Sequence, residues 1–194
     1  IDFAKNLTHK GLEIDQKAFM LGLEDALNNR QSRLTEDEMS MAIDEAEKRM
    51  MKKRNADRKI QGEKNIKEGL AFLAENAKKP GVKTLDNGIQ YKIINEGKGE
   101  SPKEGDTIFA HYEGRFIDGQ VFDSSYKRGT LLKFPIGNVI TGWGEVLKIR
   151  KPGDKWEIAI PAELSYGEKG AGETIGPNKT LLFTIELIQF TSAE

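Results

Sequence analysis

The chain has 194 residues, with 30 lysines and arginines against 31 aspartates and glutamates, and no cysteine. A charge balance this close to neutral argues against nucleic acid as the partner, and the lack of cysteine excludes disulfide bonds, thiolate nucleophiles and cysteine-ligated metals. No apolar run approaches the roughly 18 residues that a membrane-spanning helix needs, so no span is predicted.

Proline, glycine and aromatic residues are concentrated in the second part of the chain. All six prolines and sixteen of the 20 glycines lie at or after Pro80. We therefore expect residues 1–80 to be helical and the remainder to be rich in strands and turns. Because the chain opens on Ile1 and not on methionine, we expect that a preceding segment was removed, either as a signal peptide or by a cloning choice.

Residues 1–33 predict two short amphipathic helices. The first covers about 2–9, and the second runs to about residue 27 after Asp15, a suitable N-cap. Isolated helices shorter than about 12 to 15 residues are marginal in water. Both helices must therefore pack against something.

A third, very long helix is predicted to begin at the capping box formed by Thr35 and Glu38 and to meet no breaker before Pro80. Forty residues of helix span roughly 60 Å. Its middle, 52–59, is polar on every face, which is typical of a spacer between domains. Gly62 and Gly69 each cost about 1 kcal/mol relative to alanine in a helix interior, so flexing is predicted there.

The start of the long helix carries apolar residues, among them Met39, Ile43 and Met50. Together with the two short helices, they would form a core that is too small for one chain. Association of two chains is the favoured interpretation. The alternative is a helical bundle that folds back onto the C-terminal domain.

From Leu85 onward the apolar period changes to two, which predicts strands. Asp118 and Gly119 form a two-residue hairpin signal, and 142–149 is the one convincing helix. The predicted fold class is α+β, with a C-terminal antiparallel sheet of five or six strands wrapped around one short helix. An all-α N-terminal region with a very long connecting helix precedes it.

Residues 111–143 combine aromatic and aliphatic side chains with glycines and one carboxylate, Asp123, which follows Phe122. This pattern predicts an apolar pocket with a polar anchor. A carboxylate in an apolar stretch is costly unless it is satisfied, so a partner is expected. Its role is open between electrostatic stabilisation of a substrate and a structural tie to Tyr112 or Arg128.

Other chemistries have weak support in the sequence. Ser124 and Ser125 with Asp123 and His111 contain the ingredients of a hydrolase but lack the G-x-S-x-G context. The two histidines of the chain lack companion ligands at metal spacing, so no metal site is predicted.

At this point the chain resembles the FKBP-type peptidyl-prolyl cis-trans isomerases. The matching motifs are AHYEG at 110–114, DGQVFDSS at 118–125, VITGW at 139–143, Tyr166-Gly167 after Pro161, and TLLFTIEL at 180–187. The N-terminal helices are similar to those of the dimeric macrophage infectivity potentiator subfamily of Gram-negative bacteria.

The resemblance implies a cleft with Trp143 as its floor. Its other substrate-binding residues would be Tyr112, Phe122, Phe134, Val139, Ile175 and Phe183. The catalytic residues would be Asp123, Tyr166 and Ile140, the last through its backbone N–H. The chain departs from the family pattern at two places. As a result, Arg128 is an uncertain partner for Asp123, and Ala171 is assigned no role.

The resemblance also implies rotation of X-Pro bonds in protein clients by desolvation and hydrogen bonding, without cofactor, metal or covalent chemistry. It implies a V-shaped homodimer through the N-terminal helices, with folding-chaperone action on unfolded clients, and binding of macrolide inhibitors such as rapamycin. The alternative is a chaperone first and an isomerase second.

Three segments follow from these expectations: 1–33 for dimerisation, 34–80 as the spacer helix and 81–194 as the isomerase domain. The expected location is the periplasm or the outer membrane, with the cytoplasm as the alternative.

Overall fold

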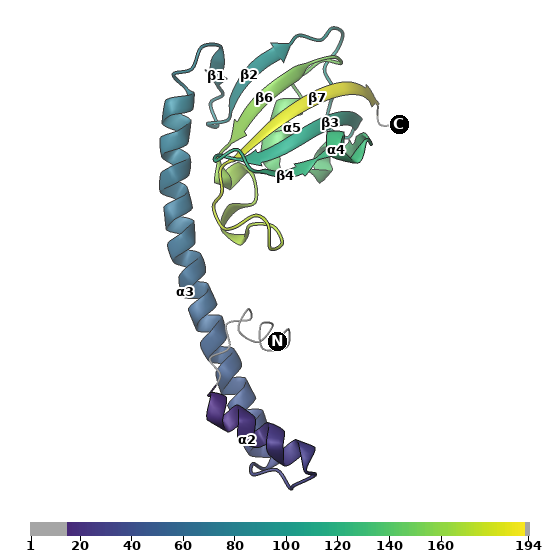
Figure 1. Ribbon diagram of the computed structural model, residues 1–194. Coiled ribbons are helices and arrows are strands. Elements are labelled where there is room, and N and C mark those ends of the chain that lie inside the picture. Colours follow the sequence, from purple (N-terminus) through teal and green to yellow (C-terminus); the bar gives the residue numbers. More distant parts are fainter. Residues whose placement is uncertain (1–14, 193–194) are drawn as a thin grey trace. The chain divides into compact units, whose positions relative to one another are not determined.

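The computed structural model describes residues 15–192, which divide into two compact units, one up to Asp57 and one from Arg58 onward (Figure 1). Helix α3, Glu36–Asn76, gives its first part to one unit and its last part to the other. The helix predicted at 2–9 lies outside the described residues. Within the described part, no helix is long and apolar enough to cross a membrane.

The first unit contains α2, Gln16–Leu27, and the first part of α3. Asp15 caps α2 as predicted, because its Oδ1 accepts hydrogen bonds from two backbone N–H groups of the first turn. The predicted capping box is also present. The Thr35 N–H donates to the Glu38 carboxylate at 2.8 Å, and the Glu38 N–H donates to Thr35 Oγ1 at 3.3 Å.

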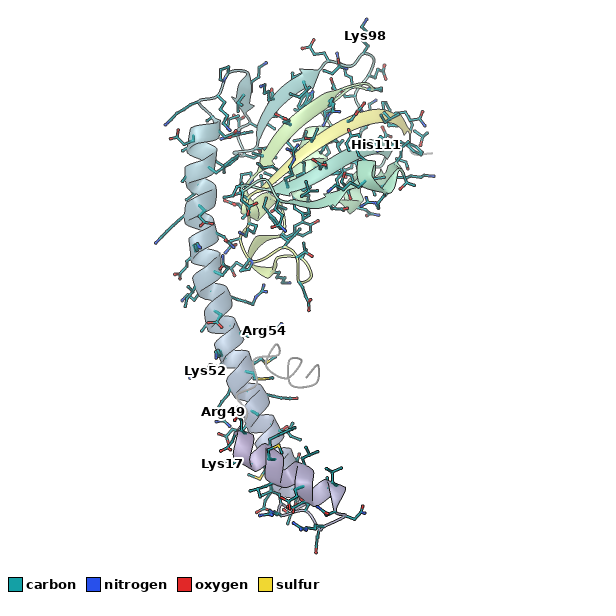
Figure 2. All side chains as sticks on the ribbon, viewed as in Figure 1. Lys17, Arg49, Lys52, Arg54, Lys98 and His111 are labelled. Carbon is teal, nitrogen blue, oxygen red and sulfur yellow. The ribbon has the colours of Figure 1, made fainter. Side chains whose placement is uncertain are left out.

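Apolar side chains of this unit are exposed in the single chain. Met20 is 60% exposed, Leu27 75% and Met41 71%. In the segment 52–59, predicted to be polar on every face, every residue is exposed except Arg58, which is half-buried; Lys52 of this segment is labelled in Figure 2. The first unit thus presents an apolar surface for which the described chain provides no cover.

The second part of α3 packs closely against the remainder of its unit. Gly62, Asn65 and Gly69 are buried there, whereas their helix neighbours are exposed. A Cβ built on Gly69 would lie 2.3 Å from Thr180 Oγ1. These glycines allow a close approach of helix and loop, a role that helix propensity alone does not predict.

The second unit also contains an antiparallel sheet of seven strands. In sheet order the strands are β1 Val82–Thr84, β2 Gln90–Asn95, β6 Lys155–Ile160, β7 Leu181–Thr191, β3 Thr107–Phe116 and β4 Val121–Ser124, with β5 Leu132–Pro135 also paired to β3. The fold class is confirmed. The sheet has one strand more than expected, because β1 is too short to show an apolar period.

Burial along β3 alternates from residue to residue, with Ile108, Ala110, Tyr112, Gly114 and Phe116 buried. These side chains share one face of the sheet, because side chains alternate along a strand. Helix α5, Thr141–Leu147, packs on that face, and Figure 1 shows it behind the curved sheet. A second short helix, α4, Ser125–Arg128, was not predicted.

Arg150 is completely buried, and its guanidinium lies 5.0 Å from the ring of the core residue Trp156. It donates hydrogen bonds to the carbonyls of Asp154 and Ile185 at 2.8 and 2.6 Å. Burial lowers its pKa to about 10. The charge is thus held by backbone carbonyls and by the indole face.

Candidate active site

Trp143 on α5 is the centre of an aromatic cluster and is 4% exposed. Its ring lies 5.2 Å from that of Tyr112 on β3, 5.3 Å from that of Phe183 on β7, and 5.7 Å from that of Phe134 on β5. The first two pairs are nearly perpendicular, the edge-to-face geometry that aromatic rings favour. The indole is therefore fixed from three sides by different strands.

Gly114 makes room for the aromatic rings that flank this cluster. It lies opposite Phe183 in the β3–β7 register. A Cβ at Gly114 would lie 2.5 Å from the Phe122 ring and 3.0 Å from that of Phe183. The two rings instead meet edge to face, with centroids 5.7 Å apart.

Ile140 lies at the N-terminus of α5, with Val139 before it, and both are half-buried against the core. The Ile140 carbonyl accepts hydrogen bonds from the N–H groups of Trp143 and Gly144 at 2.9 and 3.3 Å. No described residue accepts a hydrogen bond from the Ile140 N–H. This donor is thus available to a ligand.

Asp123 on β4 has hydrogen-bond partners, as expected for a carboxylate in an apolar stretch. Its carboxylate accepts hydrogen bonds from the Tyr112 hydroxyl and from Arg128 of α4, and Arg128 also donates to the Tyr112 hydroxyl at 3.0 Å. Burial alone would raise the pKa of Asp123, but the two hydrogen bonds and the Arg128 charge outweigh it and hold the pKa below its usual value. Arg128, uncertain from sequence, is the ion-pair partner.

Tyr166 and Ile175 come from the long loop between β6 and β7. Tyr166 is 38% exposed, and its hydroxyl has no hydrogen-bond partner within residues 15–192. Burial, with the nearby Asp123 charge, raises its pKa and keeps it a donor. Ile175 is buried and is held by an antiparallel bridge to Ala171.

The predicted apolar pocket residues lie in the apolar core of the second unit or against it. Tyr112, Phe134, Trp143, Ile175 and Phe183 belong to one buried apolar cluster, and Phe122, Val139 and Ile140 pack against it. An amide that entered this region would exchange water for aromatic rings, with the Ile140 N–H and the Tyr166 hydroxyl as its donors.

The hydrolase alternative is not supported. His111 Nδ1 lies 3.0 Å from Ser125 Oγ, but Ser125 is completely buried and accepts the Tyr112 N–H at 2.8 Å. His111 instead stacks on Tyr126 at 4.7 Å. Among the described residues, no group of three or more His, Asp or Glu side chains is placed to hold a metal ion.

Comparison with known proteins identifies the family of the chain. Residues 98–188 match the model of the FKBP-type peptidyl-prolyl cis-trans isomerase family, and residues 1–93 match that of the domain amino terminal to it. The chain is 46% identical over 177 residues to "Peptidyl-prolyl cis-trans isomerase Mip" of Coxiella burnetii, covering 91% of this chain and 77% of that protein.

Two further proteins extend the similarity to nearly the whole chain. "Outer membrane protein MIP" of Legionella longbeachae is 40% identical over 192 residues, covering 99% of this chain and 82% of that protein. The crystal structure of FkpA from Escherichia coli superposes with a TM-score of 0.81 at 36% identity, covering 98% of this chain and 88% of that one. The chain therefore belongs to the FKBP-type peptidyl-prolyl cis-trans isomerases, in the group that carries the amino-terminal domain, as its motifs predict.

Proposed function

We propose that the isomerase site is the apolar region over Trp143, and that X-Pro bonds of protein clients bind there. The proline ring would lie on Trp143 between the side chains of Tyr112, Phe122, Phe134, Val139, Ile175 and Phe183. The observation that carries the proposal is the combination of this single apolar cluster with two unpaired donors, the Ile140 N–H and the Tyr166 hydroxyl.

Desolvation and hydrogen bonding can account for the catalysis. The barrier to peptide rotation is about 18 to 20 kcal/mol and arises from amide resonance, which a polar solvent favours. A dry cleft removes that solvent, and donors fixed before the substrate arrives hold the twisted amide. Lowering the barrier by about 5 to 8 kcal/mol would accelerate rotation roughly ten thousand-fold to a million-fold.

Asp123 takes a double role in this proposal. Its pKa lies below the usual value, so the carboxylate is charged at neutral pH. The charge acts on the twisted amide, while the bonds to Tyr112 and Arg128 fix the wall of the cleft. Comparing Asp123→Asn with Arg128→Ala separates the two roles, because only the first removes the negative charge.

The site assignment is tested by isomerisation of a short X-Pro peptide, followed with and without rapamycin. Tyr166→Phe should lower kcat/KM about tenfold, equivalent to about 1.4 kcal/mol, and rapamycin should abolish activity. Tyr126→Phe is the matched control, since that tyrosine donates to Glu186 at 2.7 Å and lies outside the apolar cluster. Unchanged kinetics in Tyr166→Phe and Asp123→Asn would remove both residues from the mechanism.

Dimerisation through residues 1–33 is the second part of the proposal, with 34–80 as the spacer and 81–194 as the isomerase domain. It is supported by the exposed Met20, Leu27 and Met41 and by the match to the family's amino-terminal domain. A second copy that covered these side chains would remove their apolar area from water. Each Å² removed would stabilise the dimer by about 25 cal/mol. Sedimentation of Leu27→Asp against the parent chain tests it, with monomers expected for the variant.

The exposed apolar side chains also favour a second candidate function, a dimeric client-binding chaperone whose isomerase activity is secondary. Suppression of aggregation of a chemically denatured protein, measured with saturating rapamycin, separates the two functions. Suppression of aggregation that persists while isomerisation is blocked would support the chaperone function.

We further propose a periplasmic or outer-membrane location, because one relative is named an outer membrane protein. Fractionation of the source cells tests this location.

A further inference from the structure

The face of α3 that carries Gly62, Asn65 and Gly69 contacts the loop between β6 and β7. The three residues follow one another at spacings of three and four, so they share one side of the helix. All three are buried, whereas Glu63, Lys64, Lys67 and Glu68 on the other sides are exposed. This narrow strip is thus one contact between the helix and the loop.

Asn65 makes a polar contact inside this strip. Its side-chain amide donates to the Pro177 carbonyl at 2.6 Å, and its own Oδ1 accepts from Gln61 Nε2 at 2.8 Å. At 2% exposure, Asn65 has no access to water that could replace these bonds. The nitrogen and the oxygen of the Asn65 amide each have a hydrogen-bond partner, so the orientation of the side chain is fixed.

Arg58 holds the loop at a second point. Its Nη2 donates to the carbonyls of Glu168 and Lys169, at 3.1 and 2.8 Å. Helix α3 therefore contacts the loop two residues after Tyr166 and again two residues after Ile175. Figure 1 shows this yellow-green loop beside the upper part of α3.

Contacts within the loop connect these anchors to the two residues of the cleft. The Asn178 N–H donates to the Gly167 carbonyl at 2.8 Å, directly after Tyr166. The Gly170 N–H donates to the Tyr166 carbonyl at 3.1 Å, and Ala171 and Ile175 exchange hydrogen bonds at 2.8 and 3.0 Å. A shift of either anchor would be passed to Tyr166 and Ile175 through fixed backbone bonds.

We propose that Asn65 and Arg58 of α3 are positioning residues of the isomerase, which set the Tyr166–Ile175 loop in the geometry that the substrate needs. This inference rests on the proposed roles of Tyr166 and Ile175 in the cleft. A displacement of about 1 Å in a substrate-positioning group can lower a rate by a factor on the order of a hundred. The end of the long helix is accordingly part of the catalytic domain and not only a spacer.

The test uses the full chain with Asn65→Asp, which keeps the side chain's size and removes the N–H donor. KM and kcat are measured separately with one X-Pro peptide, and hydrogen exchange is followed at the amides of Ala171, Ile175 and Asn178. We expect KM to rise about three- to tenfold and the three amides to exchange faster. Lys67→Ala, on the exposed side of the same helix, should leave both unchanged.

The readout distinguishes positioning from a loss of folded protein. A smaller folded fraction lowers the apparent kcat and leaves KM unchanged, so an unchanged KM in Asn65→Asp overturns the proposal. Arg58→Met gives a second reading at a partly exposed site that does not threaten folding, and KM should rise about two- to threefold there. An unchanged KM in Arg58→Met counts against the proposal in the same way.

Ile175→Ala separates this proposal from the site assignment. If Ile175→Ala raises KM and Asn65→Asp does not, the positioning role fails while the cleft assignment stands. If Asn65→Asp raises KM while Ile175→Ala and Tyr166→Phe are inert, α3 still positions the loop, and the assignment of those two residues to the cleft is wrong.

Discussion

Asp123 is held by donors from two other elements, Tyr112 of β3 and Arg128 of α4. Its pKa is lower in the folded chain than in the unfolded one. A carboxyl of this kind stabilises the fold above the unfolded pKa of about 3.9, and the contribution is lost as the pH falls through the folded pKa. Stability of the cleft wall should therefore depend on pH at the acid end.

The pH dependence can be measured by comparing Asp123→Asn with the parent chain. We expect the variant to have the lower Tm at pH 7, because asparagine cannot form the ion pair. The difference should narrow as the pH falls below about 3.9, because the carboxyl of the unfolded chain then takes up a proton before that of the folded chain. Thermal unfolding followed by circular dichroism at several pH values checks this, and a constant difference would assign the loss to packing.

Gly114 is a second residue whose role depends on side chains from other strands. Gly114→Ala should destabilise the domain by about 1 to 3 kcal/mol, because the new methyl group would lie 2.5 Å from the Phe122 ring. Gly144→Ala is the control, since its Cβ would have no neighbour closer than 3.9 Å. Urea unfolding of the two variants gives the comparison, and equal stabilities would contradict the crowding at Gly114.

At the scale of elements, helix glycines in two environments allow helix propensity to be compared with packing. Gly22 in α2 has nothing within 4 Å of a built Cβ, so Gly22→Ala should stabilise its helix by about 1 kcal/mol. Gly69→Ala should instead destabilise by about 1 to 3 kcal/mol, because of Thr180. Calorimetry of both variants measures the two changes in stability. If both substitutions stabilise the protein, the predicted difference between Gly22 and Gly69 is wrong.

The elements that are predicted best from the sequence are those that depend on local signals. The cap at Asp15 and the capping box at Thr35 are local, and the structure has both. The chain also turns at Asp118, but β3 and β4 are joined by residues 117–120 and not by the predicted two-residue hairpin. Helix α4 and the role of Gly69 could not be predicted, because a four-residue helix has no period and the glycine's neighbour lies over 100 residues away.

The candidate site divides in the same way. Its aromatic residues could be named because strand alternation and the family motifs place them on one face. Arg128 could be named only as an uncertain partner of Asp123, because the pairing depends on α4. The contact of Asn65 with the loop could not be predicted, because it joins residues 112 positions apart. Contacts of this kind follow from the folded chain alone.

At the scale of the whole molecule, the compact unit that contains the isomerase begins at Arg58, inside α3. A chain of residues 58–194 should keep the parent kcat/KM for a short peptide and sediment as a monomer. A chain of residues 81–194 should lose part of that activity, because it lacks Arg58 and Asn65. Kinetics and sedimentation of both truncations test this, and a dimeric 58–194 chain would place the self-association elsewhere.

The aromatic floor has one more consequence, which concerns fluorescence. The chain has two tryptophans, and the indole N–H groups of Trp143 and Trp156 are both buried without a hydrogen-bond partner among the described residues. Indoles in such dry surroundings emit at short wavelength. Trp156 lies in the apolar core against Arg150. The Trp156→Phe chain therefore carries a single indole emitter, Trp143. Its emission should change as a proline-containing peptide or a macrolide covers Trp143, so occupancy can be followed without a label.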